Sequence, residues 1–202
     1  MFTSKNEPKK TSVVILAAGF SSRMKSPKPF LKYDSNTLFI EKIIQTYREF
    51  GCEEIIVVFN PQGFEYYQLN KLKFPENTKL VINDVPDSPR FISVKLGLKN
   101  NTSEYCFIQN VDNPFINIQT LQLLSENKDS SAYIVPVYDN KSGHPILLGA
   151  DVINNISQLE GDDYILSEIL KQQKRIQLTI NEPNIHYNIN SPDNYTKLGL
   201  PF

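Results

Sequence analysis

Short apolar runs alternate with helical patterns in the first half of this chain, and this alternation constrains the fold more than any other feature. Residues 13–16 (VVIL) and 55–59 (IIVVF) carry no polar side chain. Such runs are typical of strands buried on both faces of a parallel sheet. Between them, from about Thr37, apolar residues keep the spacing of one helical face, and Gly51 is placed to end the helix. This order predicts parallel pairing in a doubly wound sheet.

The rest of the chain also divides into short elements. We predict strands at residues 13–16, 54–59, 79–82, 105–109, 132–138, 145–148, 176–180 and 185–189, and helices at residues 37–50, 64–73, 90–99, 117–126, 151–158 and 164–172, with a last helix starting at Ser191. The length of 202 residues fits one domain. We therefore expect a flexible N-terminus at residues 1–10 and a single α/β, Rossmann-like domain at residues 11–202.

Composition and charge narrow the possible partners. The formal net charge is −1, so no overall positive field exists to attract nucleic acid. Cys52 and Cys106 lack the spacing of a metal site, as do His144 and His186, and the cysteines fit reduced cytosolic thiols. No apolar stretch has the length of a secretion signal or a membrane span. We expect a cytoplasmic protein without a nucleic-acid or membrane partner.

The segment that follows the first predicted strand has the composition of a phosphate-binding loop. Residues 16–24 (LAAGFSSRM) are mostly small, which lets the backbone approach a ligand closely. Arg23 and Lys28 add two cations that suit a triphosphate. Gly19 is the only glycine here, so the segment is neither a Walker loop nor a dinucleotide fingerprint. An ordinary strand–helix loop with solvent-facing cations is the alternative, and the spacing through Lys28 favours phosphate binding.

A second polar segment follows the strand predicted at residues 105–109. Asp112 lies there in an Asp-x-Pro turn, where it can bond nearby amides or bind a metal. Ligands of doubly wound sheets bind at the carboxyl ends of the strands. Both polar segments are predicted at that edge, so we expect them to be neighbours in space.

These motifs resemble those of a known family. Residues 16–28 resemble the LAAGxSxRMGxxK motif of nucleotidyltransferases with a glycosyltransferase-A-like fold, and the most similar branch is that of the molybdopterin cytidylyltransferases. Further matches follow in the order of that branch: residues 110–114 resemble GDQP, 143–145 GHP, 159–163 LxGDxG, and 188–193 DIDTPED. The resemblance covers almost the whole chain.

The resemblance implies a fold, a reaction and a set of site residues. The fold is a three-layer sandwich with a mostly parallel mixed sheet, of the nucleotide-diphospho-sugar transferase type. The reaction moves a nucleoside monophosphate from CTP or GTP to a phosphorylated acceptor such as molybdopterin, with Mg²⁺ as cofactor and release of pyrophosphate. The implied residues are catalytic Arg23, Lys28 and Asp112; nucleotide-binding Leu16, Ala17, Ala18, Gly19, Ser21, Ser22 and Ser93; and the metal ligands Asp112 and Asn190.

Several departures from the family pattern keep other functions open. Lys25 and Val111 replace glycines, and Asn188 and Asn190 replace aspartates. Residues 89–92 stand where relatives have a Gly-x-Ser-Ser stretch near the nucleobase, and only Ser93, Lys95 and Gly97 keep that pattern. A sugar-phosphate or other small-metabolite nucleotidyltransferase, and a non-catalytic nucleotide-binding protein, therefore remain alternatives to the molybdopterin cytidylyltransferase.

Overall fold

The computed structural model describes residues 10–19, 27–85 and 89–201. These residues form one α/β domain around an eight-stranded sheet with the order β3-β2-β1-β4-β7-β5-β6, in which β8 also pairs with β5. The strands are β1 (Thr11–Ala17), β2 (Glu54–Phe59), β3 (Thr78–Ile82), β4 (Tyr105–Asn110), β5 (Ala132–Tyr138), β6 (Lys141–Ser142), β7 (Ile146–Leu148) and β8 (Lys174–Thr179). The flexible terminus predicted at residues 1–10 falls almost entirely outside the described residues.

The four strands β1 to β4 form a parallel half, as the apolar runs predict. β1 lies between β2 and β4 and pairs with both in parallel, and β3 pairs in parallel with β2. Every residue of β1 is buried. The remaining strands make the sheet mixed, because β7 is antiparallel to β4 and to β5 while β8 is parallel to β5. The predicted mostly parallel mixed sheet is therefore confirmed.

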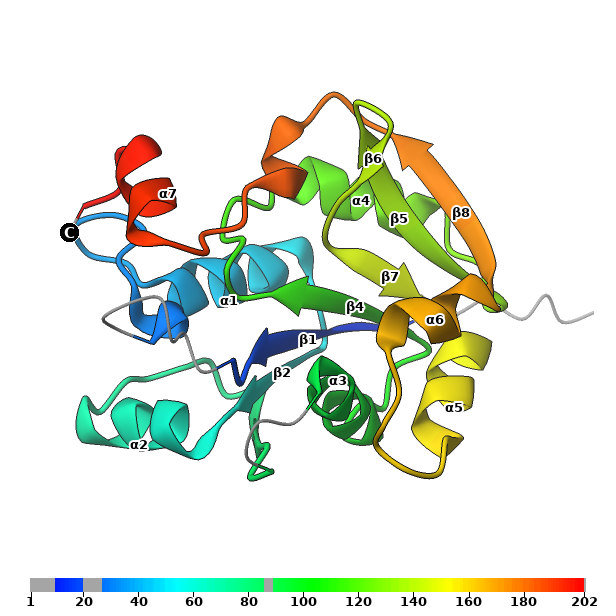
Figure 1. Ribbon diagram of the computed structural model, residues 1–202, viewed down its shortest axis with the longest axis horizontal. Helices are drawn as coiled ribbons and strands as arrows, with labels where there is room; N and C mark the ends of the chain where they lie inside the picture. The colour runs from blue at the N-terminus through cyan, green and yellow to red at the C-terminus, as the bar shows by residue number, and fades with distance from the viewer. Residues whose placement is uncertain (1–9, 20–26, 86–88, 202) are drawn as a thin grey trace, which may run out of the picture.

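Helices cover both faces of the sheet and complete the three predicted layers. Successive side chains of β1 point to opposite faces: Val13 and Ile15 join one core cluster, and Val14 and Leu16 join the other. The first cluster includes side chains of α1 (Phe39–Phe50), α2 (Pro61–Leu69) and α4 (Ile118–Glu126), and the second those of α3 (Arg90–Lys99), α5 (Ala150–Gln158) and α6 (Leu166–Lys171). Figure 1 shows α1 and α3 on opposite sides of β1.

Local signals set most helix ends. Gly51 ends α1 in the left-handed conformation at φ 96°, as predicted. Asn117 caps α4, and Ser191 caps α7 (Pro192–Lys197). The helix predicted at residues 64–73 is instead α2, which begins at Pro61, because the Asn60 side chain accepts from the Gly63 amide and Pro61 suits the first turn. No described helix is long and apolar enough to cross a membrane.

The strand predicted at residues 185–189 is wrong. Residues 183–186 form the 3₁₀ helix η2 (Pro183–His186), and the chain continues without strand pairing. The backbone of this region bonds to two other segments instead: the Ile189 amide donates to the Asp112 carbonyl at 2.7 Å, and Ile185 accepts from the His144 amide at 3.2 Å. Hydrogen bonds to distant loops thus take the place of hydrogen bonds to a neighbouring strand. They hold residues 183–190, here termed the closing segment, beside the carboxyl end of β4.

Candidate active site

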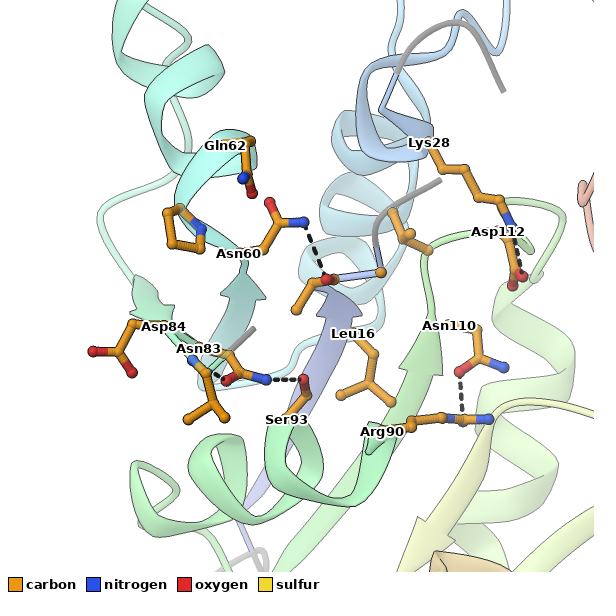
Figure 2. A pocket seen from close by; sticks show the side chains of 15 residues that line it. Leu16, Lys28, Asn60, Gln62, Asn83, Asp84, Arg90, Ser93, Asn110 and Asp112 are labelled. Atoms are coloured by element: carbon orange, nitrogen blue, oxygen red, sulfur yellow. Dashed lines mark hydrogen bonds and ion pairs between the residues drawn. The ribbon is translucent and has the colours of Figure 1, made fainter. Parts of the chain in front are cut away.

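A pocket lies at the carboxyl ends of β1 to β4, the edge where the sequence predicts the ligand site. Its volume is about 340 Å³. Figure 2 shows Lys28, Asp112, Asn110 and Arg90 along one side, with Asn83 and Asp84 across the pocket from them. The two predicted polar segments therefore meet, as expected for the carboxyl edge of a parallel sheet.

Most of the predicted residues within the described ranges line this pocket. They are Leu16, Ala18, Gly19, Lys28, Ser93 and Asp112. Ala17 differs, because its side chain is buried in the core, so only its backbone could contact a ligand. Ser21, Ser22 and Arg23, together with Lys25, lie outside the described residues.

Lys28 joins the two predicted metal ligands. Its Nζ donates to Asn190 Oδ1 at 2.6 Å and lies 3.5 Å from Asp112 Oδ2. The Lys28 and Asp112 side chains are only 16% and 21% exposed, so solvent screens their charges incompletely. The other oxygen, Asp112 Oδ1, is buried and has no hydrogen-bond partner among the described residues. One carboxylate, one amide oxygen and one ammonium group thus converge, with an oxygen left to bind a ligand.

Buried polar groups hold the Asp112 turn in shape. Gln109 Nε2 donates to the carbonyls of Asn110 and Asn113 at 2.8 and 2.9 Å, and the Tyr47 hydroxyl donates to Gln109 Oε1 at 2.9 Å. Burial raises the pKa of Tyr47 well above its ordinary value, so the phenol stays a neutral donor. Sequence reasoning missed these supports, since a tyrosine at an apolar position of a helix gives no sign of a polar contact.

The closing segment braces the same turn from the other side. Asn113 is 1% exposed, and its Nδ2 donates to the Asn184 carbonyl at 3.0 Å. This bond and the Ile189–Asp112 bond hold the Asp112 turn against the closing segment, while Gln109 holds it from the side of β4. The backbone that carries the Asp112 carboxylate is therefore held in place before any ligand binds, which lowers the cost of binding.

Three polar residues missed by sequence reasoning stand at the other end of the pocket. Asn60 Nδ2 donates to the Ala18 carbonyl at 3.1 Å, which ties the phosphate-loop backbone to the end of β2. Asn83 Nδ2 donates to Ser93 Oγ at 2.9 Å, and Asp84 lines the pocket beside it with an exposed carboxylate. Asn60 and Asn83 each directly follow an apolar strand, and this position is the signal that could have identified them.

Each of the three residues that keep the family pattern in α3 has a structural contact. Ser93 accepts from Asn83, as described. Lys95 Nζ donates to the Gly161 carbonyl at 2.8 Å, so it attaches the 159–163 motif to α3. A Cβ on Gly97 would lie 2.3 Å from Val14 Cγ1, which no packed core tolerates. Gly97 therefore lets α3 lie close against β1.

Arg90, in the departing stretch 89–92, also lines the pocket and was not foreseen. Its Nη2 donates to Asn110 Oδ1 at 2.5 Å. Burial, followed by the positive charge of Arg90, lowers the pKa of His144 to about 4. His144 is therefore neutral near pH 7, and within residues 10–19, 27–85 and 89–201 its buried Nδ1 has no hydrogen-bond partner.

Comparison with known proteins identifies a family and similar curated relatives. Residues 13–176 match the MobA-like NTP transferase domain. Proteins of two Clostridium perfringens strains, named "Probable molybdenum cofactor guanylyltransferase", are 29% identical over 202 residues and 27% identical over 203 residues, each match covering 94% of this chain and 96% of the relative.

Solved structures share the fold at low sequence identity. Rv0371c of Mycobacterium tuberculosis H37Rv superposes with a TM-score of 0.80 at 19% identity, covering 94% of this chain and 98% of that one. Its manganese complex gives a TM-score of 0.76 at 18% identity, covering 95% and 98%. A nucleotidyl transferase from Methanothermobacter gives 0.76 at 21% identity, covering 94% and 95%.

Proposed function

This chain belongs to the MobA-like NTP transferase family, and on that premise we propose that it transfers GMP from GTP to a phosphate of molybdopterin and releases pyrophosphate. The observation that carries the proposal is the convergence of Lys28, Asp112 and Asn190 at the carboxyl edge of the sheet. The family resemblance implies a catalytic lysine and two metal ligands at these three positions, and their convergence supports those roles. The names of the Clostridium relatives favour guanylyl over cytidylyl transfer.

The donor atoms at this point fit Mg²⁺. A carboxylate and an amide oxygen are hard ligands, and Mg²⁺ often takes only one or two ligands from protein. Asp112 Oδ1, which is buried and lacks a hydrogen-bond partner in the described part of the chain, is suited to such a cation. No group of three or more His, Cys, Asp or Glu residues in the described part of the chain could hold a metal, so triphosphate and water would supply the rest. Bound by Asp112 and Asn190, the cation would neutralise charge on the α-phosphate and on pyrophosphate.

The protein's own groups bind, orient and stabilise charge. The acceptor phosphate is ionised at neutral pH, so its oxygen can attack the α-phosphorus without a strong base, and pyrophosphate leaves without a covalent enzyme intermediate. Lys28 stabilises the charge that builds on the phosphates, and we assign the same role to Arg23. We assign triphosphate binding to the backbone of Leu16, Ala17, Ala18 and Gly19 and to Ser21 and Ser22, and nucleobase binding to Ser93.

We place the nucleobase at the end of the pocket formed by Asn60, Asn83 and Asp84. The polar groups at this end favour guanine over cytosine, the base that the sequence resemblance suggests. The side chains of Asn60 and Asn83 are already engaged with the Ala18 carbonyl and with Ser93. Asp84 supplies a carboxylate, which only accepts hydrogen bonds. Guanine offers two adjacent donors, N1–H and N2–H₂, to such a group, whereas cytosine offers one donor, N4–H₂, beside acceptors. A carboxylate therefore satisfies guanine and meets repulsion from the cytosine acceptors.

Pyrophosphate release from each of the four triphosphates, with and without molybdopterin, tests the proposal. We expect release with GTP, molybdopterin and magnesium together, and none in excess chelator. Asp84→Asn should reduce the preference for GTP over CTP roughly tenfold, since the amide also donates. A preference for CTP in the unmodified protein would reinstate the cytidylyl assignment. No release with any triphosphate would favour the non-catalytic nucleotide-binding protein.

Sugar phosphates and other small phosphorylated metabolites remain a second candidate class of acceptor because of Asn190. The sugar-phosphate branches of the fold, like the guanylyl-transferring branch, resemble this chain in having an asparagine where the cytidylyl branch has aspartate, and Asn190 Oδ1 lies in the site, bonded to Lys28. A panel of sugar phosphates and other small phosphorylated metabolites, assayed beside molybdopterin, decides between the two. Faster turnover with a panel member would move the assignment to that acceptor.

A further inference from the structure

Two cationic side chains line the pocket among the residues described there, Lys28 and Arg90. They come from different elements, the turn that follows the phosphate loop and the first residue of α3. In Figure 2 the Asp112 side chain lies between them. Lys28 approaches Asp112 directly, at 3.5 Å, whereas Arg90 is bonded to Asn110, two residues earlier in β4. The pocket thus presents a positive group on each side of Asp112.

The stereochemistry of the proposed reaction gives the two cations different partners. In a displacement at phosphorus, the attacking and leaving oxygens lie roughly in line on opposite sides of the phosphorus atom. The α-phosphate belongs at Asp112, and the leaving pyrophosphate belongs on the side of the phosphate loop and Lys28. The attacking oxygen must then approach from the other side. Arg90 is the cationic side chain that lines the described pocket on that side.

The Arg90–Asn110 pair has the chemistry of a phosphate-binding group. The guanidinium carries five N–H donors in a planar fork, and its bond to Asn110 leaves several of them for a ligand. Because that bond engages the amide oxygen of Asn110, the remaining polar group of the amide is a donor. The neighbouring His144 ring is neutral near pH 7, so it adds no second positive charge beside Arg90. Donors and one fixed positive charge suit a phosphate better than a nucleobase or a ribose.

We propose that Arg90, oriented by Asn110, binds the phosphate of the acceptor and so selects phosphate-bearing acceptors. This inference rests on the proposed function, since it takes the position of the α-phosphate from it. The alternative occupant of Arg90 is a phosphate of the triphosphate itself, and a kinetic separation of the two substrates distinguishes them.

The first experiment compares Michaelis constants for the two substrates. Arg90→Gln should raise KM for the acceptor about 10- to 100-fold, the value of a lost charge-assisted hydrogen bond, while KM for GTP changes less than about threefold. Arg90→Lys keeps the charge but loses the fork, so its acceptor KM should fall between the two. Ser93→Ala should show the reverse pattern, with the larger effect on GTP. Arg48→Gln, an exposed arginine at the end of α1, controls for the loss of one charge.

The second experiment requires no turnover. Calorimetry should detect inorganic phosphate binding to the protein saturated with a non-hydrolysable GTP analogue, and Arg90→Gln should weaken that binding about 10- to 100-fold. Equal phosphate binding by both proteins, or a rise confined to KM for GTP, overturns the inference. If no acceptor turns over but phosphate binding still depends on Arg90, the phosphate site stands and the proposed reaction fails. Melting temperatures of the variants exclude misfolding as the cause.

Discussion

The parallel half of the sheet and the closing segment build the same site by different means. Strands β1 to β4 follow apolar runs visible in the sequence, and their register brings the pocket-lining residues to one edge. Residues 183–190 also contain apolar residues, yet they form no strand and attach through bonds to the Asp112 turn and to His144. A pattern repeated over several buried elements determines a strand, whereas a single short apolar run is decided by the partners available to it.

Asp112, where the two regions meet, should give the largest effect. Among the described residues Asp112 is the only carboxylate at the proposed metal position, so in Asp112→Asn activity should fall by more than about 1,000-fold while the melting temperature stays near that of the unmodified protein. Calorimetry of the unmodified protein should show weak magnesium binding alone and clear binding with triphosphate, each ligand tightening the other by the same factor. Triphosphate binding that is equally strong in chelator, with Asp112→Asn indistinguishable, would remove magnesium from the site.

Lys28 connects the parallel half to the closing segment, and its loss should come next. Lys28→Ala should cost about 2–4 kcal/mol of transition-state stabilisation, or roughly thirty-fold to a thousand-fold in kcat/KM. Steady-state kinetics measure this, with Lys32→Ala, on the next turn of the chain, as the control. Turnover at the unmodified rate would leave Lys28 without a catalytic role.

The parallel half alone is tested at Gly97. Gly97→Ala places a methyl group against Val14, and we expect a loss of about 1–3 kcal/mol in the free energy of unfolding. Denaturant titration measures it. The double variant Gly97→Ala with Val14→Ala should recover part of the loss, because the second change removes the colliding methyl groups. Simple addition of the two single losses would show that α3 can move away from β1.

The pH dependence of stability tests the region around the closing segment, because His144 lies there, partly buried and bonded to Ile185. Its folded pKa of about 4 lies below the ordinary value of 6.5, so its contribution to stability is complete above pH 6.5 and is lost as pH falls toward 4. His144→Gln should therefore flatten the fall in unfolding free energy between pH 7 and pH 5 by about 2 kcal/mol. Urea titrations at several pH values measure the slope. His186→Gln, which leaves His144 in place, should keep the steeper slope, and equal slopes in all three proteins would contradict this account.

Asn190 should give the smallest change. Asn190→Asp restores the charge found in the cytidylyl branch, so magnesium affinity in the presence of triphosphate should stay the same or rise by about several-fold. Calorimetry with the saturated protein measures it, and Asn194→Asp in α7 serves as the control for added charge. A weaker affinity in Asn190→Asp would mean that this side chain does not face the cation.

The sequence was sufficient where local chemistry sets the structure. The buried strands, the left-handed Gly51 and the caps at Asn117 and Ser191 depend on residues within one element, and the structure agrees. The position of Leu16 and Lys28 near Asp112 follows from the parallel pairing of β1 and β4. These features required no knowledge of distant contacts.

The remainder depends on which side chains meet across the fold, and a single sequence does not contain this information. Tyr47 supports the site through Gln109, 62 residues away, although its spacing identifies it only as core. Arg90 was passed over as part of a departure from the family pattern, and its bond to Asn110 depends on how closely α3 approaches β4. Asn60 follows an apolar strand and could have been found from the same rule that identified Asp112.

The contact between Lys28 and Asn190 spans 162 positions of the chain, and this separation has a consequence for folding kinetics. Contacts between distant residues form late, because the entropy of closing so large a loop must be met before the contact contributes. Strands β1 to β4 can therefore pair before Lys28, Asp112 and Asn190 come together at the edge of the sheet. We expect far-ultraviolet circular dichroism to recover before enzymatic activity when the denatured protein refolds, so that activity reports the last contacts to form.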